Sequence, residues 1–109
     1  MQHRDEIIIK KVISEINIGL EMLGDTDLET FLKDEMLKRA LGMTVINIGE
    51  LVKNVTEETR KEYSNIPWKA IAGMRDVTAH KYQTLRMEDV YTTVKEDFVT
   101  LKELLKTIM

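Results

Sequence analysis

The segment IPWKAIAGMRDVTAHKY, residues 66–82, holds the only proline of the chain, its only tryptophan and one of its two histidines. In its second half an arginine is followed, after four residues, by a histidine and then, after one more, by a tyrosine: Arg75, His80 and Tyr82. The sequence on both sides has the spacing of amphipathic helices. We therefore expect those helices to hold this segment in place.

Apolar residues at three- and four-residue intervals predict the flanking helices. We expect one helix over about residues 4–23, ended by Gly24, and a long one over about 27–54, begun by a capping box at Thr26 and Glu29. A short helix should end near Tyr63, and Pro67 suits the first turn of the next. A last helix should carry the apolar stripe of residues 87–108.

No stretch alternates over the length of a strand, so the fold class is all-α. We predict an up-and-down bundle of four main helices plus a short fifth. Gly42 and Gly49, seven residues apart, should lie on one helix face and allow another helix to approach closely.

Length and composition predict a single domain over residues 1–109. The chain has no cysteine, which excludes disulfides and thiolate chemistry. The polar start is unlike a signal peptide, and no apolar run approaches the roughly 20 residues of a membrane span. We expect a cytoplasmic protein with no membrane contact.

Charge is unevenly distributed along the chain. Residues 60–86 hold six basic and two acidic side chains, whereas the whole chain has a net charge of −3. This positive region can attract a phosphate-bearing ligand, although chance scatter over solvated helix faces explains it equally well.

At about 100° per residue, the segment forms a helix with two faces. Trp68, Ile71 and Ala72 share an apolar face, and Arg75 falls in its middle. A guanidinium there needs a partner. Either it pairs with a carboxylate such as Glu50, or it lines a groove and binds an anion, for which its planar fork is suited.

The other face carries Lys69, Asp76 and His80. Asp76 lies four residues before His80 and can orient the imidazole and favour its protonated form. A histidine near a helix end is also commonly a solvated residue that interacts with the helix dipole. On an unbroken helix Arg75 and His80 point about 140° apart. They converge only if the helix ends near His80 or if a two-fold dimer brings two copies together.

The dimeric arrangement suits phosphodiester cleavage. One His80 would deprotonate a ribose 2′-hydroxyl, the other would protonate the leaving 5′-oxygen, and Arg75 would stabilise the phosphorane. Tyr82 could hydrogen-bond substrate or be modified. The histidines and carboxylates lack metal-ligand spacing, and no glycine-rich phosphate loop or serine nucleophile motif is present, so we expect no metal and no cofactor.

Residues 75–82, RDVTAHKY, preceded by IPWKAIAGM at 66–74, resemble the signature of HepT-like HEPN-domain proteins, and the helical layout fits over essentially the whole chain. The resemblance implies a small helical homodimer that acts as a metal-independent ribonuclease. Arg75 and His80 would be its catalytic residues, in a cleft near the dimer interface. Beside these two, we expect Asp76, Lys69 and Lys81 of this sequence to support catalysis and position the substrate.

The resemblance further implies a toxin of a prokaryotic toxin–antitoxin pair. The antitoxin partner would be a minimal nucleotidyltransferase that transfers AMP to Tyr82, and the added charge and bulk would block RNA from Arg75. The residue after the motif arginine is commonly Asn in this family and is Asp76 here. A carboxylate at this position holds His80 more strongly but repels substrate phosphate.

Two alternatives remain open from the sequence. The chain could be a non-catalytic HEPN module that binds a nucleotide or a nucleotidyltransferase partner without turnover. It could also be a purely structural helical dimer, in which Arg75 contributes to stability alone.

Overall fold

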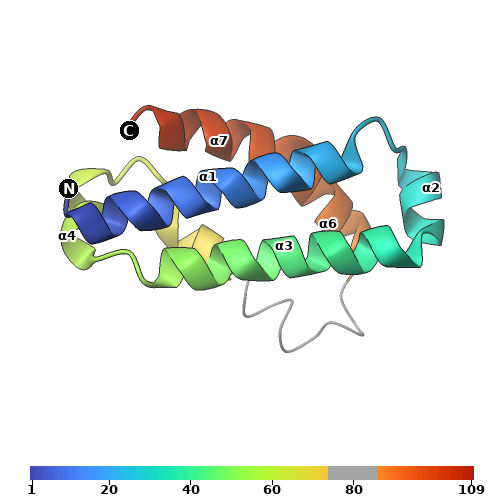
Figure 1. Ribbon diagram of the computed structural model, residues 1–109, viewed down its shortest axis with the longest axis horizontal. Helices are drawn as coiled ribbons and strands as arrows, with labels where there is room; N and C mark the ends of the chain where they lie inside the picture. Colours follow the sequence, from blue (N-terminus) through green and yellow to red (C-terminus); the bar gives the residue numbers. More distant parts are fainter. Residues whose placement is uncertain (74–85) are drawn as a thin grey trace.

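The computed structural model describes residues 1–73 and 86–109. α1 (His3–Leu23) and α3 (Glu35–Lys53) run antiparallel side by side, and the short α2 (Leu28–Lys33) connects them at one end. α4 (Glu57–Glu62) follows α3 at the other end (Figure 1). A helix begins at residue 68 and continues at least to 73. No strand occurs in the described ranges, and the all-α prediction is confirmed.

The C-terminal part packs on α1 and α3. It consists of α6 (Met87–Thr92), the π-helical segment η1 (Thr93–Asp97) and α7 (Phe98–Lys106). Apolar side chains from α1, α2, α3 and the C-terminal part meet in one core, in which the bulkiest members have almost no exposed surface. They include Ile9, Ile16, Phe31, Leu41, Ile48, Val94, Phe98 and Leu105. The predicted apolar stripes of the first and last helices therefore face the core.

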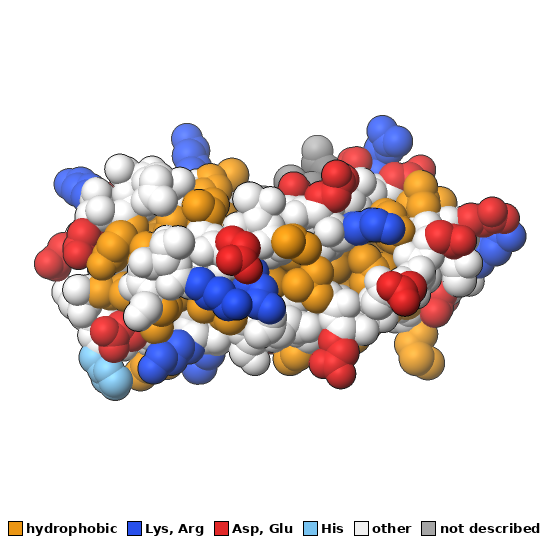
Figure 2. All heavy atoms as spheres, turned by 90° about the horizontal axis from the view of Figure 1, so that it is seen from above, with side chains coloured by type: hydrophobic (Ala, Val, Ile, Leu, Met, Phe, Trp, Pro, Cys, Tyr) orange, Lys and Arg blue, Asp and Glu red, His pale blue; other side chains and the backbone are white. Residues whose placement is uncertain are grey.

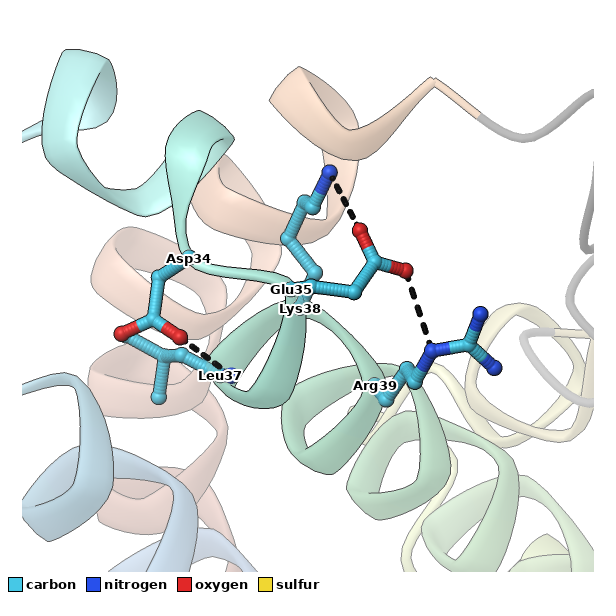
Figure 3. Close-up of polar contacts among 5 residues, drawn as sticks. All are labelled: Asp34, Glu35, Leu37, Lys38 and Arg39. Carbon is cyan, nitrogen blue, oxygen red and sulfur yellow. Dashed lines mark hydrogen bonds and ion pairs between the residues drawn. The ribbon is translucent and has the colours of Figure 1, made fainter.

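The prediction of one long helix over residues 27–54 was wrong at Asp34. This residue has an extended backbone, with φ −100° and ψ 94°, and separates α2 from α3. Its carboxylate accepts a hydrogen bond from the backbone N–H of Leu37 at 3.0 Å and so caps α3 (Figure 3). Glu35 then pairs with Lys38 and Arg39 along the first turns of the helix. The apolar pattern continues across the break, which is why periodicity alone did not reveal it.

The start of α2 also differs by one residue from the predicted capping box. Asp27, rather than Thr26, is the N-cap, and its side chain accepts from the backbone N–H of Thr30 at 2.8 Å. Gly24 does end α1, as predicted, with a positive φ of 50° that a side chain would disfavour.

A close helix approach occurs at Gly19, which the sequence analysis did not single out. A Cβ added there would lie 2.8 Å from Cε2 of Phe98 and 3.3 Å from Cγ2 of Thr44. Gly42 and Gly49, for which close packing was predicted, are both buried in α3. Gly19 thus allows α1 to lie against the first residue of α7.

None of the helices in residues 1–73 and 86–109 is both long enough and apolar enough to cross a bilayer.

Candidate functional site

The helix described over residues 68–73, which directly precedes the rest of the motif in the sequence, is anchored in the core. Ile66, Trp68 and Ile71 are buried, and the Trp68 indole N–H donates to the carbonyl oxygen of Tyr63 at 3.0 Å. The carbonyl of Pro67 accepts from the backbone N–H of Ile71, so the helix begins where the proline predicted. The predicted apolar face is confirmed as far as Ala72, which packs against the core.

The remaining predicted site residues lie outside the described residues. These are Arg75, Asp76, His80, Lys81 and Tyr82. Their convergence in one cleft and the pairing of Arg75 with Glu50 therefore stay predictions. Lys69 is the one predicted site residue that the structure describes, and its side chain is exposed.

Lys69 lines an open hollow of about 740 Å³ at the end of the molecule where α4 lies. The hollow is bounded by α4, the connection that follows it and the start of the helix over residues 68–73. Its lining residues are Glu57, Arg60, Ser64, Ile66, Pro67, Trp68, Lys69 and Ala70. The helix that leads to the motif therefore presents a cation to a concave surface.

Arg60 in this hollow also joins α4 to the end of α3. Its Nη2 donates to the carbonyl oxygens of Val52 at 2.9 Å and Lys53 at 3.2 Å, and its Nε donates to that of Val55 at 3.2 Å. Carbonyls at the end of a helix lack intrahelical partners and carry partial negative charge. The guanidinium thus satisfies these carbonyls and fixes the corner between the two helices.

A buried carboxylate fixes the same corner from the side of α1. Asp5 accepts hydrogen bonds from the hydroxyls of Thr56 and Thr59, both at 2.6 Å, and from the backbone N–H of Thr56 at 3.1 Å. Burial raises the pKa of Asp5, but these hydrogen bonds lower it by more, so that its pKa lies below the usual value. Asp5 is therefore held as a carboxylate that ties α1 to the start of α4.

Sequence reasoning missed the roles of both Asp5 and Arg60. A signal for Asp5 was present, because it precedes Ile9, Val12 and Ile16 at helical spacing and so lies on the buried face of α1. Nothing in the sequence pattern distinguished Arg60 from an ordinary solvated cation.

Two further hollows occur among the described residues. One, of about 240 Å³, lies between α7 and the start of the helix over residues 68–73 and shares Pro67 and Ala70 with the hollow around Lys69. Another, of about 420 Å³, lies between α1 and α3, with Lys11, Ser14, Glu15 and Asn47 among its lining residues.

The sign of the surface charge changes over short distances on the face drawn in Figure 2. Figure 2 shows acidic and basic side chains interspersed over the face seen from above, with no large area of a single sign among the described residues. An anionic ligand would therefore be selected by particular cations rather than by a field over that whole face.

Comparison with known proteins identifies the family. Residues 9–108 match the family model described as "Ribonuclease HepT-like". The match covers nearly the whole chain, including residues 66–82, and the chain belongs to this HepT-like family. The resemblance drawn from the motif is thereby confirmed.

Curated relatives carry corresponding names. The chain is 33% identical to "Putative RNase TTE0752" of Caldanaerobacter subterraneus subsp. tengcongensis, over 93% of this chain and 90% of that protein. It is 30% identical to "Probable ribonuclease HepT" of Thermococcus cleftensis, over 92% of this chain and 89% of that protein. A protein of Methanocaldococcus jannaschii named "Gamma-glutamylcyclotransferase and putative RNase MJ0434" is 32% identical, but this chain covers only 47% of it. No solved structure was found to match.

Proposed function

We propose that this protein is a metal-independent endoribonuclease with Arg75 and His80 as its catalytic residues. The observation that carries the proposal is the HepT-like family match, which spans the segment holding both residues. The buried anchors Ile66 and Trp68 support it, because they hold the described first half of the matched segment in the core.

The reaction is transesterification within RNA. His80 of one subunit takes the proton from a ribose 2′-hydroxyl, whose oxygen then attacks the adjacent phosphorus. The 5′-oxygen leaves with a proton from His80 of the other subunit, and a 2′,3′-cyclic phosphate remains. Arg75 binds the phosphorane through its planar fork, and Asp76 orients the imidazole. Lys69 and Lys81 position the RNA strand.

Cleavage of RNA in the presence of EDTA tests this function. We expect the wild-type protein to leave 2′,3′-cyclic phosphate ends, and His80→Ala to lower the rate about 10²–10⁴-fold, as expected for loss of a general acid–base group. His3→Ala is the matched control, since His3 is the only other histidine and its side chain is 85% exposed. Intact RNA at high wild-type concentration, or equal rates for the two variants, would exclude the proposal.

In the cell, the enzyme acts as the toxin of a toxin–antitoxin pair. A nucleotidyltransferase antitoxin neutralises it by transferring AMP from ATP to the Tyr82 hydroxyl, with release of pyrophosphate. The adenylate brings negative charge and bulk into the site and so keeps RNA phosphate away from Arg75. Co-expression with a nucleotidyltransferase encoded beside this chain should add one adenylate to the intact mass. Tyr82→Phe should abolish the addition, whereas Tyr63→Phe should not.

A further inference from the structure

Two cations from different helices face the same hollow. Lys69 reaches it from the first turn of the helix over residues 68–73, and Arg60 reaches it from α4. Lys69 has no hydrogen bond or ion pair with any other described residue, so its ammonium group is available to a ligand.

The Arg60 guanidinium is fixed in place without losing its charge. Its three partners within residues 1–73 are neutral carbonyl oxygens, and no carboxylate of the described chain lies within ion-pair distance. Its Nη1 donates to none of the described residues. A cation held in this way needs little reorganisation to bind an anion.

The surface between the two cations is apolar. Ile66, Pro67 and Ala70 line it, and Pro67 offers no N–H donor. The Ser64 hydroxyl is the neutral polar side chain in the lining. A ligand with an anionic group and a flat or weakly polar body suits this surface better than a bare inorganic anion.

We propose that this hollow binds one nucleotide of single-stranded RNA. Its phosphate lies between Arg60 and Lys69, and its ribose or base lies on the exposed side chains of Pro67 and Ala70. This inference rests on the proposed ribonuclease function and extends it to a substrate subsite.

Glu57 also lines the hollow, and the proposal predicts in which direction its removal changes the affinity for RNA. Its carboxylate repels a phosphate in the hollow, so removal of its charge should tighten RNA binding. Removal of the Lys69 charge should weaken binding and release fewer counterions from the strand.

The test measures binding of a labelled single-stranded RNA by fluorescence anisotropy at several salt concentrations, with His80→Ala as the background to keep the RNA intact. Lys69→Gln should weaken binding severalfold and reduce the slope of log K against log salt by about 0.7, the contribution of one phosphate contact. Lys61→Gln is the matched control, since Lys61 is an exposed cation of α4 that does not line the hollow.

Two more variants test the position of the ligand. Glu57→Gln should tighten binding, and Glu58→Gln, its neighbour outside the lining, should tighten it less. Ala70→Leu changes no charge but fills part of the apolar surface, so it should weaken binding of the RNA strand. Arg60 is left intact because its carbonyl contacts support the fold.

The outcomes separate this subsite from the function on which it rests. If wild-type protein cleaves RNA but Lys69→Gln and Lys61→Gln have equal salt slopes, the subsite is wrong and the ribonuclease stands. If wild-type protein neither binds nor cleaves RNA, both the subsite and the proposed ribonuclease function are wrong. A reduced slope for Lys69→Gln alone, together with tighter binding by Glu57→Gln, supports the subsite.

Discussion

At the level of single residues, the corner between α1 and α4 depends on Asp5. Its side chain is completely buried, and its carboxylate receives three hydrogen bonds from Thr56 and Thr59, more than fifty residues away in the sequence. A buried carboxylate is stable only when its charge is compensated in this way. The contact holds α1 to α4 and therefore also the segment that follows α4.

We predict that Asp5→Asn lowers the free energy of unfolding by about 2 kcal/mol at pH 7, the usual range for hydrogen bonds to a charged group. The folded-state pKa of Asp5 is lowered, so its contribution is present above the unfolded-state pKa of about 4 and is lost as pH falls through the folded value. The difference between wild type and Asp5→Asn should therefore shrink below about pH 4 in urea denaturation. A difference that is constant from pH 7 to pH 2.5 would contradict this account.

At the level of helices, the packing of α1 on the C-terminal part depends on the absence of a side chain at Gly19. A methyl group there would meet the ring of Phe98, which is fully buried and held in the core. An aromatic ring in such surroundings moves only if its neighbours also move. This contact therefore limits how closely α1 and α7 can approach each other.

We predict that Gly19→Ala destabilises the protein by about 1–3 kcal/mol, the usual cost of overpacking. Gly73→Ala is the matched control, because a Cβ there meets nothing within 4 Å in the described structure. The control should be neutral or up to about 1 kcal/mol stabilising, since alanine favours the helix over glycine. Thermal unfolding followed by circular dichroism compares the two, and equal midpoints would show that the contact at Gly19 is relaxed at little cost.

The break at Asp34 and the π-helical segment are also features of the helices. Asp34 ends one helix and caps the next within a stretch whose apolar pattern is uninterrupted. In the C-terminal part, η1 widens one turn, yet Val94 and Phe98 both stay buried. In both places the hydrophobic pattern predicted which side chains face the core. It did not predict which backbone N–H groups bond to which carbonyl oxygens.

At the level of the whole molecule, the proposed chemistry requires two copies of the chain. In the proposed mechanism one His80 acts as the base and a second His80 acts as the acid at the same phosphate. Only His3 and His80 are available, and His3 lies at the exposed start of α1. A two-fold dimer supplies the second His80 without any further residue.

We predict that a mixed dimer of wild-type and His80→Ala chains, isolated through two different affinity tags, has at most about one-tenth of the wild-type rate, since it lacks one of the two general catalysts. If each subunit acted alone, the mixed dimer would keep about half of the rate. A mixed dimer with one His3→Ala chain is the control. Failure to recover any doubly tagged species would exclude the dimer itself.

The sequence by itself determined the all-α class, the helix that contains Trp68 and Ile71, the family, and the candidate residues of the motif. These properties follow from local spacing and residue type, which are read directly along the chain. Only the tertiary structure decided that Asp5 pairs with Thr56 and Thr59, that Gly19 meets Phe98, and that Arg60 and Lys69 share a hollow. Each of these contacts joins separate helices, and periodicity within one helix carries no information about which residues of another helix will face it.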